Sequence, residues 1–302
     1  MPKRRWKWYK MANILNNHEL NELIERVNKS DISSIKEVIT QLINIINDPQ
    51  SSAKDIKNII EKDPPLAARL LKIANSAYYG FRRKISRIQD AIVGVGFNAV
   101  KELAISQKVC ELFQKSDHFE GYSRTALWEH SVAVALCNKS IYMRKFRQFG
   151  ENVYSVGLLH DIGIIIEDQF MQKEFKDMLV QSRIDTCNLP DAEKHICGFD
   201  HTDIGRAITD NWDFPEELVI AIGNHHEPDK VDDTFKDITL TTYISDYICQ
   251  RNDIGYGDAP YENKSLYEKC LIELKIKEKE MKLIIEDVQE EFKKMKNGGW
   301  FQ

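Results

Sequence analysis

Histidine and aspartate residues recur along the second half of the chain in an order that could hold metal ions. The members of this ordered set are His130, His160, Asp161, His201, His225, His226 and Asp246, and they include five of the eight histidines. Imidazole nitrogens and carboxylate oxygens suit Mn, Fe, Ni, Co or Zn, and a shared carboxylate can bridge two ions. Any one of these histidines alone would more often be a buried polar group with an ordinary partner. The ordered set instead favours a metal site.

The segments that carry these side chains repeat apolar residues at helical spacing. In this half of the chain the pattern predicts helices over residues 123–147, 152–168, 169–182, 201–211, 215–225 and 235–250. No segment alternates apolar and polar residues as a half-buried strand would, so the predicted fold class is all-α. Adjacent residues on a helix point about 100° apart. His160 and Asp161 could therefore flank one ion only at a helix end or in a crevice.

Charge is distributed unevenly along the chain. The first ten residues contribute +5 to a net charge of −5, so the remaining 292 carry −10. A body this acidic disfavours general nucleic-acid binding, because such binding depends on cations that contact phosphates. The basic head also contains Trp6, Trp8 and Tyr9. It could contact a membrane surface or RNA, or be a flexible terminus, which is the simpler interpretation.

Other compositional features exclude further classes of protein. No apolar run reaches the roughly 18 residues of a membrane span, so no transmembrane segment is predicted. The head lacks the apolar stretch of a secretory signal. None of the six cysteines forms a CxxC pair. We therefore expect reduced, mostly buried thiols in a cytoplasmic protein.

The ordered set resembles the signature of the HD superfamily of metal-dependent phosphohydrolases, and upstream motifs narrow the resemblance. The segments are DPPLAARLLKIANSAYYG at residues 63–80 and ISRIQDAIVGVGFNAV at residues 85–100. Both are similar to the opening motifs of the HDOD family, the HD-related output domain of bacterial signalling. The similarity extends over about residues 30–250.

The resemblance implies an all-α fold in two packed parts. We expect a basic tail at residues 1–11, an HDOD domain at residues 12–255 and a charged helical extension at residues 256–302. Within the domain, residues 12–120 would form the N-terminal helical part. Residues 121–255 would form the HD-type part with the metal site.

Intact HD sites also imply an assignment of ligands. By that resemblance, His130, His160, Asp161 and Asp246 would hold one divalent transition-metal ion. A second ion, bridged through Asp161, would be held by His201 and His225, with His226 as a further candidate. Glu129 and Asp203 could orient ligand imidazoles from outside the ligand set, or be solvent-facing helix acids.

Three functions remain open at this point. HDOD proteins frequently lose several HD ligands and then act through protein contacts, whereas this sequence keeps the full set. The first expectation is thus a signalling output protein with a dinuclear metal site and protein partners. The alternative is a phosphohydrolase or phosphodiesterase that acts on a nucleotide or phosphodiester, with Asp161 helping to activate water. A di-iron oxygenase, known among HD proteins, ranks last because no residue pattern selects it.

Two departures from catalytic HD proteins weaken the enzymatic interpretation. HD-GYP phosphodiesterases typically carry a phosphate-positioning lysine three residues after the HD aspartate, and here that position is Ile164. No Gly-Tyr-Pro segment follows His225-His226-Glu227-Pro228, which disfavours hydrolysis of cyclic-di-GMP. Arg82, Arg83 and Lys84 could supply positive charge instead, although exposed basic residues usually need no partner. The residues that would bind phosphate are therefore left unassigned.

Overall fold

A computed structural model describes residues 18–114, 119, 121–147, 152–185, 187–257 and 263–300. These residues form helices and no β-strand, which confirms the all-α prediction. The predicted basic tail, residues 1–11, lies outside the described residues. Within the described part of the chain, no helix is long and apolar enough to cross a membrane.

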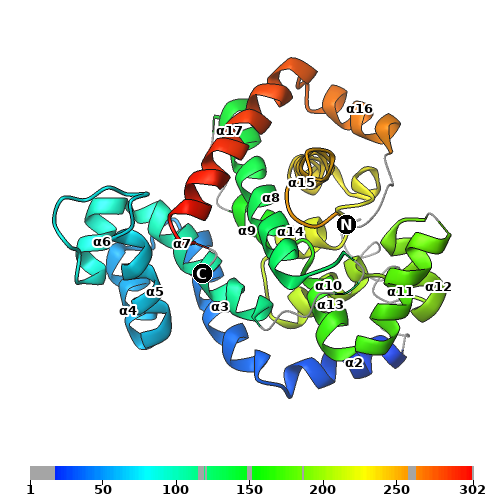
Figure 1. The fold of residues 1–302 in the computed structure, drawn as a ribbon, viewed down its shortest axis with the longest axis horizontal. Helices are drawn as coiled ribbons and strands as arrows, with labels where there is room; N and C mark the ends of the chain where they lie inside the picture. Colours follow the sequence, from blue (N-terminus) through cyan, green and yellow to red (C-terminus); the bar gives the residue numbers. More distant parts are fainter. Residues whose placement is uncertain are drawn as a thin grey trace, which may run out of the picture.

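The first half of the fold is a set of helices that ends before residue 114. Its elements are α2 (His18–Asn28), α3 (Ile32–Asn47), α4 (Ala53–Lys62), α5 (Pro64–Ala74), α6 (Ile88–Val95), α7 (Phe97–Cys110) and the 3-10 turn η1 (Glu111–Phe113). Asp63 caps the start of helix α5, because its side chain accepts a hydrogen bond of 3.1 Å from Leu66 N. Prolines in the first helical turn lose no helical hydrogen bond. Helices α4 to α6 form a lobe at one end of the molecule (Figure 1).

The second half carries the ordered set of histidines and aspartates. Its elements are α8 (Arg124–Lys145), α9 (Val153–Leu159), α10 (Ile162–Phe170), α11 (Gln172–Ile184), α12 (Leu189–Cys197), α13 (His201–Asn211), α14 (Glu216–Ile222), the 3-10 turn η2 (Pro228–Lys230) and α15 (Asp233–Arg251). Helices α8 and α9 pack against each other, and α15 packs on both. Figure 1 shows α15 nearly end-on, with α8, α9 and α14 beside it.

The structure corrects the predicted helix over residues 152–168. The chain forms two helices there, α9 and α10, and His160 and Asp161 lie at the break between them. Gly163 explains the close packing just after the break, because a Cβ atom at this position would overlap the carbonyl oxygen of His201. The break therefore turns two adjacent side chains toward one centre and lets α10 approach the start of α13.

The last two helices, α16 (Lys264–Glu273) and α17 (Glu278–Asn297), follow α15. Helix α17 buries an apolar face that includes Met281, Ile284 and Val288, and it packs along α8. Its far end reaches the N-terminal half beside α7 (Figure 1). There Trp300 packs edge-to-face on Tyr78, with ring centroids 5.8 Å apart. Helix α17 thus connects the two halves of the fold.

Candidate metal centre

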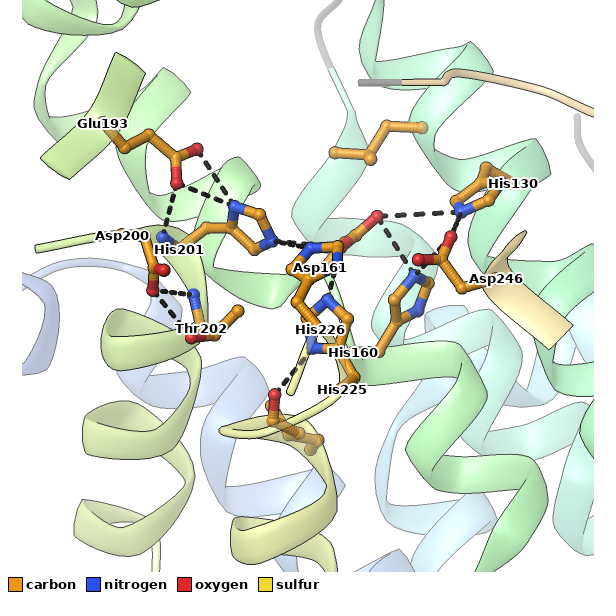
Figure 2. A network of polar contacts seen from close by, with 12 residues as sticks. His130, His160, Asp161, Glu193, Asp200, His201, Thr202, His225, His226 and Asp246 are labelled. Carbon is orange, nitrogen blue, oxygen red and sulfur yellow. Dashed lines mark hydrogen bonds and ion pairs between the residues drawn. The ribbon is translucent and has the colours of Figure 1, made fainter. Parts of the chain in front are cut away.

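Five separate segments bring their polar side chains to one buried centre (Figure 2). Helix α8 supplies His130, and the break between α9 and α10 supplies His160 and Asp161. His201 is the first residue of α13, and His225 and His226 lie in the turn after α14. Helix α15 supplies Asp246. Each of the seven is buried except His226, which is partly buried. All seven residues of the ordered set therefore meet, although the first and the last, His130 and Asp246, are 116 positions apart in the sequence.

One side of the centre is a group of four side chains. His130 Nε2 lies 2.9 Å from Asp246 Oδ1, and His160 Nε2 lies 3.8 Å from the same oxygen. Asp161 Oδ2 completes the group, at 3.1 Å from His160 Nε2 and 3.9 Å from His130 Nε2. Ligands about 2.0–2.2 Å from a common ion lie some 3–4 Å from one another. The spacing of these four atoms is that of a metal coordination shell.

The other side is a second group, formed by three imidazoles and the other oxygen of Asp161. His201 Nε2 lies 3.0 Å from His226 Nε2. Asp161 Oδ1 lies 3.7 Å from His201 Nε2 and 3.5 Å from His225 Nε2. The ligand-capable atoms of His201, His225 and His226 all lie within 4.8 Å of one another. Asp161 thus directs one carboxylate oxygen to each group, which is the arrangement of a bridging carboxylate.

Hydrogen bonds on the outer side of the rings fix which nitrogen faces the centre. His160 Nδ1 bonds to the carbonyl of Gly157 at 2.8 Å, and His225 Nδ1 bonds to that of Ile222 at 2.7 Å. A carbonyl can only accept, so each Nδ1 donates a proton outward and Nε2 is the nitrogen that faces the centre. Metal-binding histidines are oriented in the same way in many proteins.

Two of the inward nitrogens have no hydrogen-bond partner among the described residues. They are Nε2 of His160 and Nε2 of His225, one in each group, and both side chains are fully buried. A buried polar atom without a partner carries a penalty of about 1–3 kcal/mol. A metal ion in each group would remove that penalty, so the donor set fits metal binding.

Carboxylates set the charge states of the imidazoles. Burial alone would lower the pKa of His130, but the hydrogen bond and charge of Asp246 outweigh it and raise the pKa to about 9. Burial likewise opposes the charged form of His201, and the charge of Glu193 raises its pKa to about 10. Burial and the neighbouring imidazoles hold the pKa of His226 well below its ordinary value. His226 is therefore the neutral acceptor in its contact with His201.

Burial would also favour protonated carboxyls at Asp161 and Asp246, yet the pKa of each is lowered. For Asp161 the main opposing cause is the charge of His160, and for Asp246 it is the hydrogen bond from His130. Both groups are therefore carboxylates at neutral pH. Ionised carboxylates are the form that binds a divalent cation.

The carboxylate that orients His201 is Glu193, a residue that no sequence motif marks. Both of its oxygens contact His201 Nδ1, at 2.8 and 3.0 Å, and Oε2 also accepts from His201 N at 2.8 Å. Glu193 is fully buried on α12, a helix that was not predicted. The sequence Asn188-Leu189-Pro190 does carry a helix-start signal, and Asn188 Oδ1 accepts from Asp191 N at 2.8 Å.

Glu129 and Asp203, the two residues suggested for that orienting role, contact other groups. Glu129 Oε1 accepts a hydrogen bond of 2.5 Å from Lys296 on α17. Asp203 belongs to the capping box of α13, where its side chain accepts from Asp200 N at 3.3 Å. Their positions one residue before His130 and two after His201 turn their side chains to other faces of their helices.

We expect Glu193→Gln to weaken metal binding by about 10- to 100-fold, the usual effect of losing a carboxylate that orients a ligand histidine. The neutral amide would no longer hold the Nδ1 proton of His201 with two charged oxygens. Titration of the metal-free protein with Mn²⁺ measures the change. Glu174→Gln, at an exposed position on α11, is the matched control. Equal Mn²⁺ affinity in Glu193→Gln and the parent protein would contradict this role.

A pocket of about 360 Å³ reaches the centre from outside. Its lining includes His226 and Asp246, one residue from each ligand group. One wall is α12 with the turn that follows α14, and the other is α15 with the start of α16. The volume lies in the range of small-molecule sites.

The structure also places the residues considered for phosphate binding. Ile164 is 1% exposed and belongs to the core of α10. Arg82, Arg83 and Lys84 lie in the loop between α5 and α6, at the end of the molecule away from α12 and α15 (Figure 1). Among the described residues, the cations that line the pocket are Lys194 and Lys230.

The chain is thus an all-helical protein with a buried centre of histidine and aspartate side chains. The model of the HDOD domain family matches residues 32–228, more than half of the chain. The chain belongs to the HDOD family, as its sequence motifs predict. It spans less than half the length of the curated relatives it matches, 44% of one and 15% of another.

Solved structures share this fold. An HDOD domain protein with unknown function from Geobacter sulfurreducens has a TM-score of 0.72 and 25% identity, covering 84% of this chain and 87% of that one. A provisionally named phosphohydrolase from Shewanella amazonensis SB2B has a TM-score of 0.71 and 20% identity, covering 95% and 99%. A provisionally named signal transduction protein from Marinobacter aquaeolei VT8 has a TM-score of 0.77 and 18% identity, covering 96% and 66%. The latter two likenesses concern the fold alone.

Proposed function

We propose that this chain is a bacterial signal-transduction protein whose HD-type half binds two divalent transition-metal ions. His130, His160 and Asp246 would hold one ion, and His201, His225 and His226 the other, with Asp161 as the shared ligand. The observation that carries the proposal is the division of the Asp161 oxygens between two groups, each with an unpartnered inward nitrogen. The imidazole-rich donor set favours Fe, Mn, Co, Ni or Zn over Mg or Ca. Its signalling output would pass through protein partners.

A second candidate function, hydrolysis of a phosphate ester, is favoured by the pocket that ends on His226 and Asp246. Bound metal ions would lower the pKa of a water molecule and hold a phosphate for attack. The chain itself keeps Asp161 and Asp246 ionised and excludes bulk water from the rest of the centre, since the other ligands are buried. The di-iron oxygenase alternative has no observation in its favour among the described residues.

One experiment separates these functions. The purified protein is analysed for bound metals and assayed against nucleotide and phosphodiester substrates, with Asp161→Ala as the control. We expect bound metal in the parent protein and loss of it in the variant. Turnover that disappears in Asp161→Ala would support the hydrolase, and bound metal without such turnover would support signalling alone. A protein that binds no added metal would contradict both.

A further inference from the structure

One acidic side chain lies inside the apolar core of α10. Glu167 is fully buried, and the three residues before it, Ile164, Ile165 and Ile166, are at most 1% exposed. Neither carboxyl oxygen of Glu167 has a hydrogen-bond donor among the described residues. An ionised carboxylate without a donor is strongly disfavoured in such a place, because burial removes its water and nothing replaces it. The surroundings of Glu167 therefore favour a proton on its carboxyl group.

Helical spacing directs Glu167 toward the start of α13. Gly163 lies four positions earlier on the same face of α10, and it packs against the backbone of His201. The carboxyl group of Glu193 on α12 lies within hydrogen-bonding reach of Glu167. Both oxygens of Glu193 contact His201 Nδ1, at 2.8 and 3.0 Å. Glu167 and Glu193 therefore form a buried pair of carboxyl groups behind one of the candidate metal ligands.

Two carboxyl groups can hydrogen-bond to each other only if one of them carries a proton. The contacts assign that proton to Glu167, because Glu193 accepts hydrogen bonds from the backbone and ring of His201. Burial and the charge of Glu193 raise the pKa of Glu167 well above its ordinary value, and Asp200 and Cys197 raise it further. The pair thus carries one negative charge, which lies on the carboxyl that contacts His201.

We propose that Glu167 is a positioning residue, whose carboxyl group donates a hydrogen bond to Glu193 and so holds that carboxylate against His201. A carboxylate has about four lone-pair sites, so Glu193 can accept from Glu167 while it contacts the ring and backbone of His201. This inference rests on the proposed metal site and deepens it. It extends the support of His201 by one residue, from Glu193 on α12 to Glu167 on α10.

Infrared difference spectroscopy tests the proton on Glu167 and needs no metal. The spectrum of the metal-free variant Glu167→Gln is subtracted from that of the parent protein at neutral pH. The C=O stretch of a neutral carboxylic acid lies at higher frequency than the bands of a carboxylate. We expect a carboxylic-acid band that Glu167→Gln lacks and that Glu174→Gln, the matched exposed control on α11, retains. Loss of carboxylate bands instead would show that Glu167 is ionised and would overturn the proposal.

Metal affinity tests what the hydrogen bond does. Mn²⁺ is titrated by calorimetry into the metal-free parent protein, Glu167→Met and Glu167→Gln. Methionine has a similar length but no donor, so we expect the ion held by His201 to bind about tenfold more weakly, the lower end of the range for lost support of a ligand histidine. The glutamine amide can donate to Glu193 in place of the acid, so its affinity should stay close to that of the parent protein.

A packing control separates positioning from general destabilisation. Ile165→Val removes a buried methyl group one helical position away from Ile164 and Ile166, so it should lower the Tm without changing the Mn²⁺ affinity. Equal Mn²⁺ affinity in the parent protein and Glu167→Met, or an equal loss in Glu167→Met and Glu167→Gln, would overturn the positioning role. A parent protein that binds no Mn²⁺ would contradict the metal site, and the infrared band alone would then decide whether Glu167 donates to Glu193.

Discussion

Replacing Asp161 with asparagine should remove both metal ions at once. Each oxygen of Asp161 faces a different ligand group, at 3.1 Å from His160 Nε2 and 3.5 Å from His225 Nε2. An amide offers one weak oxygen donor and no charge, so neither group keeps its full ligand set. We expect the affinity for each ion to fall by more than about 100-fold, beyond the effect of losing an orienting residue.

Thermal unfolding with and without Mn²⁺ measures this loss. Metal at 100 times its dissociation constant stabilises a one-site protein by about 2.7 kcal/mol, and a second ion adds a similar amount. For a chain of this size that corresponds to a rise in Tm of roughly 10 °C. Asp161→Asn should show almost none of this rise, while Asp177→Asn, at an exposed position on α11, should show all of it. A full metal-dependent rise in Asp161→Asn would show that Asp161 does not bridge the ions.

Metal binding at pH 7 should release about two protons per chain. The raised pKa values, about 9 for His130 and about 10 for His201, mean that both imidazoles are protonated in the metal-free protein. His130 Nε2 then donates to Asp246 Oδ1 at 2.9 Å, and His201 Nε2 donates to His226 Nε2 at 3.0 Å. These are the nitrogens that face the two ligand groups, so each ion must displace one proton. The affinity for each ion should therefore rise about tenfold per pH unit from pH 7 toward these pKa values.

The stability of the metal-free protein should have the opposite pH dependence. Both imidazoles have a folded-state pKa above the ordinary value of about 6.5. The stability that they contribute is thus fully present below that value and is lost as the pH rises through about 9 and 10. The lowered pKa values of Asp161 and Asp246 act on the acid side, where their contribution falls away as the pH drops below about 4.

Calorimetric titration with Mn²⁺ in buffers of different ionisation enthalpy counts the released protons. The variant Glu193→Gln removes the charge that raises the pKa of His201, so the count should fall toward one. Chemical unfolding of metal-free protein between pH 6 and pH 10 measures the stability trend. Proton release near zero in the parent protein, or metal affinity that does not change with pH, would refute this account of the charge states.

The sequence predicted the fold class, the family and the meeting of seven side chains because each depends on pattern. Apolar spacing indicates helices, and an ordered set of ligand-type residues indicates a shared centre. His160 and Asp161 do lie at a break between two helices, where adjacent side chains can turn toward one centre. The break itself was missed. It depends on close packing between α10 and α13, which the apolar run around it does not reveal.

Contacts between distant segments account for the other differences. No local motif marks Glu193, because its role depends on an unpredicted helix, α12, which packs against α11 and brings Glu193 to His201. The position of Glu129 next to His130 suggests that it orients a ligand imidazole, yet its carboxylate pairs with Lys296 from the last helix. Lys194 and Lys230 are likewise not marked by any local motif, because only the fold brings them to the lining of the pocket.

Anomalous X-ray diffraction from crystals of Mn²⁺-loaded protein would locate the metal ions of the dinuclear site. We expect two anomalous peaks on opposite sides of Asp161, one bonded to each carboxylate oxygen at about 2.0–2.2 Å. The first peak should also contact His130, His160 and Asp246, and the second His201, His225 and His226. A single peak, or peaks that leave Asp161 outside the coordination shells, would contradict a dinuclear site that shares Asp161.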